Sequence, residues 1–507
     1  MNSVEQLKAE KDGLEVLHDL DRFAAMPWKE IPETDLQRLK WVGLFHREQT
    51  PGLFMLRLRI THGCLTSNQA RAIADCSAAC GGGVIDLTTR QQIQLRNLEL
   101  KDVPGLFRRL QAVGLHSMQT GMDNVRNITG CPVAGLDAQE LIDTRTLARE
   151  LTDQLVGNRA YTNLPRKFNL SLTGCRENCA HAETNDLGLT PAYRVTRDGE
   201  VLGFNLHAGG ALGGANPRLA TPLDLFARPE EAVELALLVL DLYRDHGPRE
   251  SRSKARLKVL LDAWGAARFR EELERRAGRE LERAGAREFL GDGRNDHLGV
   301  RAQKQPGRFY VGLCVPVGRM EARQLAEAAR LATAYGAGQI RLTVGQNLLL
   351  TNLPERNLNG LLAEPLLQEL RPDPAPVLRG LVACVGNDYC AFSTIDTKGL
   401  ALQLARELEG KLPTGAAPRI HVSGCPRACG KHHVADLGLL GFQLRGPDGM
   451  VPAAEVFTGG STGADRRLAQ NTGRRIAWSA LPDYIAGLWS EGNLLAQPAA
   501  DERSAAD

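Results

Sequence analysis

Hydrophobic and polar positions alternate over short stretches near the start of this chain, and the same pattern returns 255 residues later. FMLRLRITHG (54–63) aligns with FYVGLCVPVG (309–318), and residues 83–92 align with 338–347 at the same displacement. Each copy predicts a strand, a helix over 66–80 or 321–335, a strand, a second strand over 93–97 or 348–352, and another helix. This order is a βαββα unit, so the pattern predicts a duplicated α+β fold.

A second pair of similar segments follows the two units. NLSLTGCRENC (169–179) resembles IHVSGCPRAC (420–429), with a displacement of 250 residues from Cys175 to Cys425. We therefore predict a pseudo-twofold duplicated unit, each half a ferredoxin-like half-domain followed by a larger α+β domain. Between the halves, residues 228–288 are rich in Glu, Arg, Leu and Ala at helical spacing and predict two solvated helices.

These patterns set the predicted domain limits. We expect an N-terminal extension over 1–45, half-domains over 46–118 and 296–372, larger α+β domains over 119–295 and 373–495, and a disordered tail over 496–507.

Length and charge narrow the class of protein. The 507 residues suffice for about three domains, and 62 Lys and Arg nearly balance 60 Asp and Glu. A balanced charge gives no general attraction to nucleic acid or to an anionic membrane. The chain start lacks a basic segment followed by an apolar core, and no apolar run is long enough to span a bilayer. We expect a cytoplasmic monomer that binds neither nucleic acid nor membrane.

Four of the eleven cysteines form two closely spaced pairs, Cys384 with Cys390 and Cys425 with Cys429. In a reducing cytosol such cysteines are free thiols or metal ligands, and four thiolates are the usual ligands of a 4Fe–4S cluster. The spacing of Cys425 and Cys429 predicts a helix start with both thiols on one face, whereas Cys384 and Cys390 fit a loop. The alternatives are buried apolar thiols and a zinc site, although a five-residue gap exceeds the usual zinc spacing.

The first half of the chain carries an incomplete counterpart of these pairs. Cys175 and Cys179 match Cys425 and Cys429, but only Cys131 precedes them. These three thiols could in principle hold a second metal. We favour a remnant whose buried thiols act as small hydrophobic groups.

Positively charged positions gather in four segments. Alternation in LRLRI (56–60) places Arg57 and Arg59 on one strand face, and further cations stand in TTRQQIQ (88–94), MDNVRN (122–127) and LPRKFN (164–169). A single such segment is more often a solvated sheet face. Several cations converging on one cavity repel one another unless an anion or a polyacid fills it, so together they indicate an anion site.

Taken together, these motifs resemble the sirohaem-containing nitrite and sulfite reductases, most closely the ferredoxin-dependent assimilatory nitrite reductases. The resemblance spans residues 35–490 and rests on FMLRLRI, TTRQQIQLRNL, GMDNVRNITGCPVAG, NLPRKFN, SRSKARLKVLLDAWG, AQKQPGRFYVGLCVPVGR, RLTVGQNLLL and the four cysteines. It implies six-electron reduction of nitrite to ammonium in nitrate assimilation, with sirohaem and a 4Fe–4S cluster as cofactors. The domain over 119–295 would bind sirohaem, and the domain over 373–495 would carry the cluster.

The resemblance also implies roles for single residues. The cluster ligands are Cys384, Cys390, Cys425 and Cys429, and Cys429 bridges the cluster to the sirohaem iron. The cations that hold the substrate anion are Arg57, Arg126 and Lys167. The residues that contact the carboxylates of the macrocycle are Arg90, Gln94, Arg166 and Gln346. Sirohaem bears eight carboxylates, which suits a cationic cavity.

Asn169 bears on the choice of substrate. Members that prefer sulfite resemble a pattern with a second lysine at this position, and a dianion gains more from an extra cation than a monoanion does. Asn169 therefore favours nitrite, and an assimilatory sulfite reductase making sulfide is the alternative within the family. From another class, the alternative is a zinc-stabilised binding module.

Two further features concern electron supply and the cluster. The glycine-rich segments 81–83 and 207–217 do not match G-x-G-x-x-G, so electrons are expected from a separate carrier, ferredoxin or a similar one-electron protein. Arg427, two residues before Cys429, departs from the small polar residue usual in the family. An arginine there could raise the potential of the cluster or pair with a carboxylate of the macrocycle.

Overall fold

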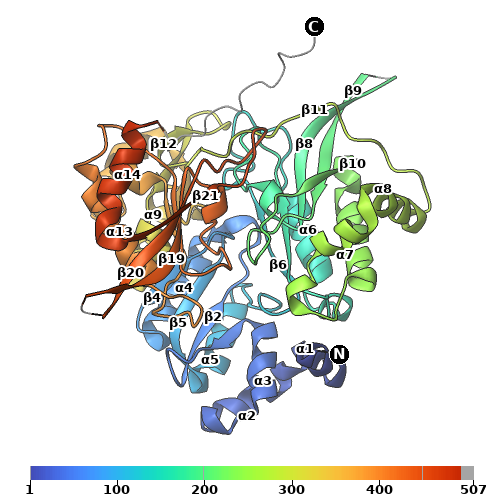
Figure 1. The fold of residues 1–507 in the computed structure, drawn as a ribbon, viewed down its shortest axis with the longest axis horizontal. Coiled ribbons are helices and arrows are strands. Elements are labelled where there is room, and N and C mark those ends of the chain that lie inside the picture. The colour runs from blue at the N-terminus through green and yellow to red at the C-terminus, as the bar shows by residue number, and fades with distance from the viewer. Residues whose placement is uncertain (1, 198, 448, 493–507) are drawn as a thin grey trace. The chain divides into compact units, whose positions relative to one another are not determined.

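The computed structural model describes residues 2–197, 199–447 and 449–492, which divide into two units (Figure 1). Unit 1 consists of Met1–Ala211 and Arg218–Asp373, and unit 2 consists of Leu212–Pro217 and Pro374–Asp507. Helices and strands alternate in both units, so the predicted α+β class is confirmed. The tail predicted to be disordered, 496–507, lies outside the described residues.

The two βαββα units lie in unit 1 and form two five-stranded sheets. The first sheet has the order β1 (Leu44–His46), β2 (Leu53–Arg57), β5 (Ile93–Glu99), β4 (Val84–Leu87), β14 (Arg319–Glu321). The second sheet has the order β12 (Gly299–Ala302), β13 (Arg308–Leu313), β16 (Leu348–Pro354), β15 (Gln339–Leu342), β3 (Cys64–Thr66). The predicted helices are α4 (Ser67–Cys80) and α9 (Ala322–Tyr335), and the predicted second strands are β5 and β16.

Each of these sheets ends on a strand from the other copy. β14 pairs with β4, and β3 pairs with β15. The chain enters the swapped strands through His62 (φ 57°) and Val317 (φ 48°), two corresponding residues in the left-handed region, which is unusual for a β-branched valine. Because the strands cross over, apolar residues of both copies form one core, within which α4 and α9 contact each other.

The local sequence explains where α4 and α9 begin and which of their residues are buried. Thr66 and Gln69 form a capping box at the start of α4, and Glu321 and Gln324 form one at the start of α9. Within α4 the buried positions recur at helical spacing, at Ala70, Ile73, Ala74 and Ser77.

The third sheet of unit 1 has six strands. Its order is β10 (Thr221–Ala227), β9 (Gly199–Ala208), β8 (Leu187–Thr196), β7 (Phe168–Leu172), β6 (Val125–Gly130), and β11 (Arg287–Glu288) pairs with β8. The core against this sheet comes from α6 (Arg145–Leu155), α7 (Ala232–His246) and α8 (Leu257–Ala277). The two helices predicted over 228–288 therefore exist as α7 and α8. The description of both as solvated is wrong, because each buries one face. The buried residues include Leu235, Val239 and Leu242 on α7, and Leu260 and Phe269 on α8.

Unit 2 repeats this sheet. Its order is β17 (Leu381–Ala383), β18 (Ile420–Ser423), β19 (Leu437–Gly446), β20 (Gly449–Thr458), β21 (Gln470–Ala477). The first two pairings are parallel and the next two antiparallel, as in β6–β10. Helices α13 (Thr397–Glu409) and α14 (Leu481–Ser490) lie beside each other along the unit 2 sheet (Figure 1).

The remaining helices are short. They are α1 (Ser3–Glu10), α2 (Leu20–Ala24), α3 (Glu33–Arg38), α5 (Val103–Gln111), α10 (Leu358–Leu362), α11 (Leu366–Glu369) and α12 (Pro376–Arg379). Among the helices formed by the described residues, none has the length and apolar character needed to cross a membrane.

Candidate functional site

The four paired cysteines lie together in unit 2, at the ends of two neighbouring parallel strands, β17 and β18. Cys384 directly follows β17, and Cys390 lies in the turn beyond it, so the predicted loop is confirmed. Cys425 follows β18, separated from it by Gly424 alone, and Cys429 is exposed. The carboxyl ends of parallel strands meet at one edge of a sheet, which brings the two pairs to the same edge.

The helix start predicted over Cys425–Cys429 is wrong. This segment is a series of turns, and the first helical residues after it form a single turn at His432–Val434. Ala428 (φ 53°) and Lys431 (φ 61°) are in the left-handed region, which a right-handed helix cannot contain.

The thiols of unit 2 interact electrostatically. Burial first, and then the charge of Cys429, raises the pKa of Cys384. Burial raises the pKa of Cys425 to about 11, and the charges of Cys429, Cys390 and Cys384 add to this shift. Four thiolates therefore need a cationic centre to coexist, and a 4Fe–4S cluster bound through four cysteines meets that need. The Gly424 N–H also donates to Cys384 Sγ at 3.2 Å, the kind of hydrogen bond that tunes cluster ligands.

Arg427 lies between Cys425 and Cys429 and stacks on an aromatic ring. Its guanidinium carbon is 3.4 Å from the centre of the Phe392 ring, a residue that the sequence analysis missed. A glycine-rich segment also approaches this loop, because Gly214 N–H donates to Pro426 O at 3.0 Å. A Cβ at Gly213 would lie 2.5 Å from Arg427 O, so only glycine fits there.

In unit 1 the predicted anion-binding arginines converge. Arg57, at the end of β2, donates to Thr120 O at 3.0 Å, and Arg126 on β6 donates to the same carbonyl. Burial, followed by the positive charges of Arg57 and Arg90, holds the pKa of Arg126 well below its ordinary value. Arg57 also stacks on Phe45, with its guanidinium carbon 4.7 Å from the ring centre. These cations repel one another, which is the arrangement expected around an anion.

Arg59 has a different task from Arg57. It is 5% exposed and donates to the backbone carbonyls of Gln119, Val125 and Arg126. Strand β2 ends at Arg57, so the two arginines do not share one strand face as the alternation predicted. Arg59 therefore joins β2 to β6 rather than facing a ligand.

A buried carboxylate that the sequence analysis did not single out anchors part of this cationic group. Asp123 lies within hydrogen-bonding distance of Arg252 (2.8 and 2.9 Å), Arg166 (3.3 Å) and Lys8 (3.4 Å). Burial opposes its ionisation, but the hydrogen bonds from Arg252 and the charge of Lys8 hold the pKa of Asp123 below its ordinary value. Its signal in the sequence is one acidic residue inside a cationic motif, MDNVRN.

Asn169 lies on β7, the strand next to Arg126, and Lys167 directly precedes that strand. Val125 of β6 pairs with Phe168 of β7, so Lys167 precedes and Asn169 follows that pair. Lys167 is half-buried, and Asn169 is 6% exposed. The side-chain oxygen of Asn169 is buried without a hydrogen-bond partner, and so is that of Asn127 on β6. Such unpartnered polar atoms are rare in native proteins and are expected where a ligand supplies the partner.

Gln94 and Gln346 differ in their surroundings. Gln94 pairs with Arg57 across β5 and β2, and its side-chain oxygen accepts a hydrogen bond from Arg96. Its amide NH₂ is the group that can donate to a carboxylate. Gln346 donates through Nε2 to Leu87 O at 2.9 Å, and its counterpart Gln91 donates to Leu342 O at 2.8 Å. Gln346 thus also connects the two half-domains. Arg90 lies between β4 and β5, and its carbonyl accepts from Asn127 at 2.9 Å.

The three cysteines of unit 1 also lie together. The sulfurs of Cys131 and Cys175 are 3.7 and 3.6 Å from that of Cys179, and all three residues are buried. Hydrogen bonds from the Cys131 and Cys179 thiols hold the pKa of Cys175 well below its ordinary value. The sequence analysis missed His297, whose Nε2 is 3.1 Å from Cys179 Sγ and whose pKa burial lowers to about 4.

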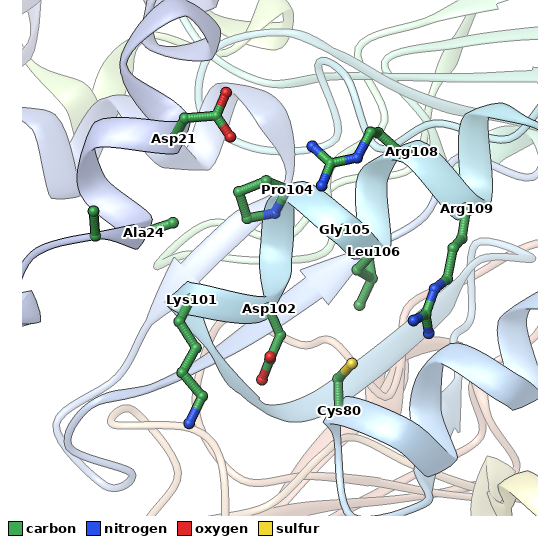
Figure 2. A pocket seen from close by; sticks show the side chains of 11 residues that line it. Asp21, Ala24, Cys80, Lys101, Asp102, Pro104, Gly105, Leu106, Arg108 and Arg109 are labelled. Carbon is green, nitrogen blue, oxygen red and sulfur yellow. The ribbon is translucent and has the colours of Figure 1, made fainter.

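A pocket is lined by residues of the N-terminal extension and of the first half-domain (Figure 2). Its volume is about 400 Å³, and its lining side chains are Asp21, Ala24, Ala25, Cys80, Lys101, Asp102, Pro104, Gly105, Leu106, Arg108 and Arg109. None of the residues predicted for the functional site is among them.

Two family models match the chain. The nitrite and sulphite reductase 4Fe-4S domain matches residues 121–281 and 375–490, and the nitrite/sulfite reductase ferredoxin-like half domain matches residues 46–113 and 301–367. These ranges lie inside the domain limits predicted from the sequence, which stay predictions.

Individual proteins match over nearly the whole chain. The ferredoxin–nitrite reductase of Synechococcus elongatus is 47% identical over 97% of this chain and 96% of its own length. The assimilatory ferredoxin-dependent nitrite reductase of Haloferax mediterranei is 39% identical over 96% of this chain and 88% of its own length. The structure of the Mycobacterium tuberculosis NirA protein superposes with a TM-score of 0.89 at 29% identity, over 96% of this chain and 93% of that one. Four thiols at one sheet edge, a convergent group of arginines and these matches together show that the chain belongs to the nitrite and sulphite reductase family.

Proposed function

We propose that this protein is a ferredoxin-dependent nitrite reductase that converts nitrite to ammonium. The observation that carries the proposal is the convergent group of Arg57, Arg90 and Arg126, together with the uncharged Asn169 on the neighbouring strand. The relatives named as ferredoxin–nitrite reductases, at 39–47% identity, support the same reaction.

The donor sets fit two cofactors. Cys384, Cys390, Cys425 and Cys429 would hold the 4Fe–4S cluster, with Cys429, the exposed thiol, shared with the sirohaem iron. Arg90, Arg166, the amide of Gln94 and Gln346 would contact the sirohaem carboxylates. The mutual repulsion around Arg126 fits a polyanionic ligand. When bound, the two cofactors supply the electrons of the reduction one at a time.

The residues of the chain bind the substrate and stabilise charge. Conversion of nitrite to ammonium consumes six electrons and eight protons and releases two water molecules, so negative charge and proton demand arise on the nitrite oxygens. Arg57 and Arg126, held side by side on Thr120 O, would stabilise that charge without reorganising. Lys167, with its titratable ammonium, would donate protons to the departing oxygens.

Asn169 supports nitrite over sulfite as the substrate. It is buried, uncharged and directly follows the position paired with β6, so the anion there meets one lysine, Lys167, and not two. One cation fewer favours a monoanion over a dianion. The sulfite-reducing alternative is not supported by the names of the relatives.

The proposal also covers the electron donor and the cellular compartment. Ferredoxin or a similar one-electron carrier would dock on the protein, and the reaction would take place in the cytoplasm. Charge complementarity would set the rate of this docking, so the rate with ferredoxin is expected to fall as ionic strength rises.

The test is steady-state reduction of nitrite and of sulfite with an artificial one-electron donor, on wild type, Asn169→Lys and Lys167→Met. We expect wild type to prefer nitrite, and Asn169→Lys to shift the ratio of kcat/KM values towards sulfite. We expect Lys167→Met to lower kcat for nitrite by about 100-fold. Lys101→Met, which removes an exposed lysine of the first half-domain, is the matched control. A wild type with higher kcat/KM for sulfite would overturn the substrate assignment.

The bridging role of Cys429 has a separate test. Cys429→Ser is expected to abolish the magnetic coupling between cluster and sirohaem, seen by electron paramagnetic resonance. An intact, coupled pair of cofactors in this variant would show that Cys429 is not the shared ligand.

A further inference from the structure

The thiols of Cys131, Cys175 and Cys179 are joined by an imidazole from a remote segment. His297 follows Cys179 by 118 residues, and its Nε2 lies 3.1 Å from Cys179 Sγ. The three sulfurs lie within 4.8 Å of one another, and the four residues are 1–4% exposed. The three thiols therefore converge on one point, and the buried imidazole nitrogen contacts one of them, Cys179, so that a bound ion would have to draw it in as the fourth donor.

The spacing of the three sulfurs suits a small tetrahedral ion. Zinc holds sulfur at about 2.3 Å, so two sulfurs on one tetrahedral zinc are about 3.8 Å apart. The measured separations from Cys179 are 3.7 Å to Cys131 and 3.6 Å to Cys175. A disulfide requires about 2.05 Å.

The orientation of His297 is fixed by its neighbours. Its Nδ1 lies 3.4 Å from the hydroxyl of Tyr310 on β13, and its backbone N–H donates to Asn295 Oδ1 at 3.0 Å. A ring nitrogen held by a hydrogen bond leaves the other nitrogen as the ligand, which is the usual arrangement at metal-binding histidines. The left-handed backbone of His297 (φ 58°) is uncommon for a residue other than glycine and is often found where function demands it.

The segment that carries His297 is also tied to the cysteine loop. Gly291 N–H donates to Arg176 O at 2.9 Å, and Gly293 N–H donates to Glu177 O at 3.0 Å. His181 Nε2 lies 3.3 Å from Gly293 O. These contacts hold the imidazole against the thiols independently of any ion. If the thiols acted only as small apolar groups, they would not need an imidazole beside them. An aliphatic side chain in its place would avoid the free-energy cost of burying a polar ring.

We propose that Cys131, Cys175, Cys179 and His297 form a structural zinc site in unit 1. Zn²⁺ is the expected ion because three thiolates completed by one neutral imidazole are typical of structural zinc. The site would join the strand end after β6, the loop after β7 and the segment before β12.

The first test is the metal content of the iron-replete holoenzyme, incubated with ZnCl₂ under reducing conditions and then passed through a chelating column. We expect about one zinc per chain in wild type and in Cys314→Ser, whose buried thiol lies outside the donor set. Cys175→Ser and His297→Gln are expected to lose at least about 90% of the zinc, because structural zinc needs all four ligands. Zinc absent from wild type, or equally present in all four proteins, would overturn the proposal.

The second test needs no variant and so does not depend on the folding of one. X-ray absorption at the zinc edge of the wild-type holoenzyme is expected to give three sulfur neighbours at about 2.3 Å and one nitrogen neighbour at about 2.0 Å. Four sulfur neighbours, or only oxygen and nitrogen, would contradict the donor set. Detection of a Cys131–Cys179 or Cys175–Cys179 disulfide by mass spectrometry after alkylation would also contradict it.

Discussion

The cysteine loops of unit 1 and unit 2 share a backbone conformation and differ in the segments that complete them. Asn178 and Ala428 occupy corresponding positions, each with φ 53°, and His181 (φ 52°) corresponds to Lys431 (φ 61°). Both loops follow the second strand of a matching parallel pair. The loop conformation therefore fixes the positions of two thiols, but it does not determine which metal group they bind.

The difference lies in the remaining donors. In unit 2, Cys384 and Cys390 come from the strand end next to the loop, and the four thiols are half-buried or exposed. In unit 1 the third thiol, Cys131, also follows a strand, but the proposed fourth donor is His297, which comes from a distant segment and contacts Cys179, and all four residues are buried. An open set of four thiols suits a cluster that passes electrons, and a closed, compact set suits a single structural ion.

The largest effect should come from removing a thiol of unit 2. Cys425→Ser is expected to lose cluster iron and to lower the rate of nitrite reduction by more than about 100-fold, because even indirect damage to a metal site costs about 10- to 100-fold. Iron per chain and steady-state rates measure this. Cys314→Ser is the control, and a fully iron-loaded, active Cys425→Ser would contradict the ligand assignment.

Acid should weaken unit 1 through the carboxylate that neutralises its cations. The pKa of Asp123 is lower in the folded protein, so its stabilising effect is present above its unfolded pKa of about 3.9 and is lost as pH falls through the folded pKa. Asp123→Asn is expected to cost about 3 kcal/mol of unfolding free energy at neutral pH, since it removes the buried carboxylate that Lys8, Arg166 and Arg252 share.

Urea unfolding of wild type and Asp123→Asn at several pH values measures this difference. The two stabilities should approach each other below about pH 4. Asp21→Asn, a change in an exposed carboxylate of α2, serves as control. A difference that stays constant down to the lowest pH would show that the charge of Asp123 does not stabilise the fold.

The corresponding glutamines of the half-domains provide a paired test. Gln91→Ala and Gln346→Ala should each lower the unfolding free energy by about 1–3 kcal/mol, because each leaves a buried carbonyl without a donor. Only Gln346→Ala should also lower sirohaem content, measured by absorbance. Gln154→Ala, on the exposed face of α6, is the control. Equal loss of sirohaem in Gln91→Ala would show that Gln346 has no role in sirohaem binding beyond that of Gln91.

The smallest effect concerns the left-handed residues of the two loops. Alanine in this region costs about 1–2 kcal/mol, which glycine does not incur. Ala428→Gly should therefore stabilise the protein by up to about 1 kcal/mol. Asn178→Ala should destabilise it, because it also removes the hydrogen bond to Glu183 (2.9 Å). Thermal unfolding of both variants measures this, and a destabilised Ala428→Gly would contradict the strain argument.

Much of the fold could be predicted because it depends on local patterns. The repeat predicted α4, α9, β5 and β16, and cysteine spacing identified the four thiols of unit 2. The helix start at Cys425 was predicted wrongly because spacing alone cannot reveal that Ala428 is left-handed. Alternation made Arg57 and Arg59 appear equivalent. The strand ends after Arg57, however, and Arg59 instead donates hydrogen bonds to backbone carbonyls of the fold.

The sequence by itself determined the duplication, the family and the four thiols of unit 2, because periodicity and close spacing are properties of neighbouring residues. Only the tertiary structure decided that β3 and β14 exchange places between the half-domains, that Asp123 lies among Lys8, Arg166 and Arg252, and that His297 meets Cys179. These contacts join residues about 100 or more positions apart in several cases. Such contacts depend on how the chain packs, and no local pattern encodes them.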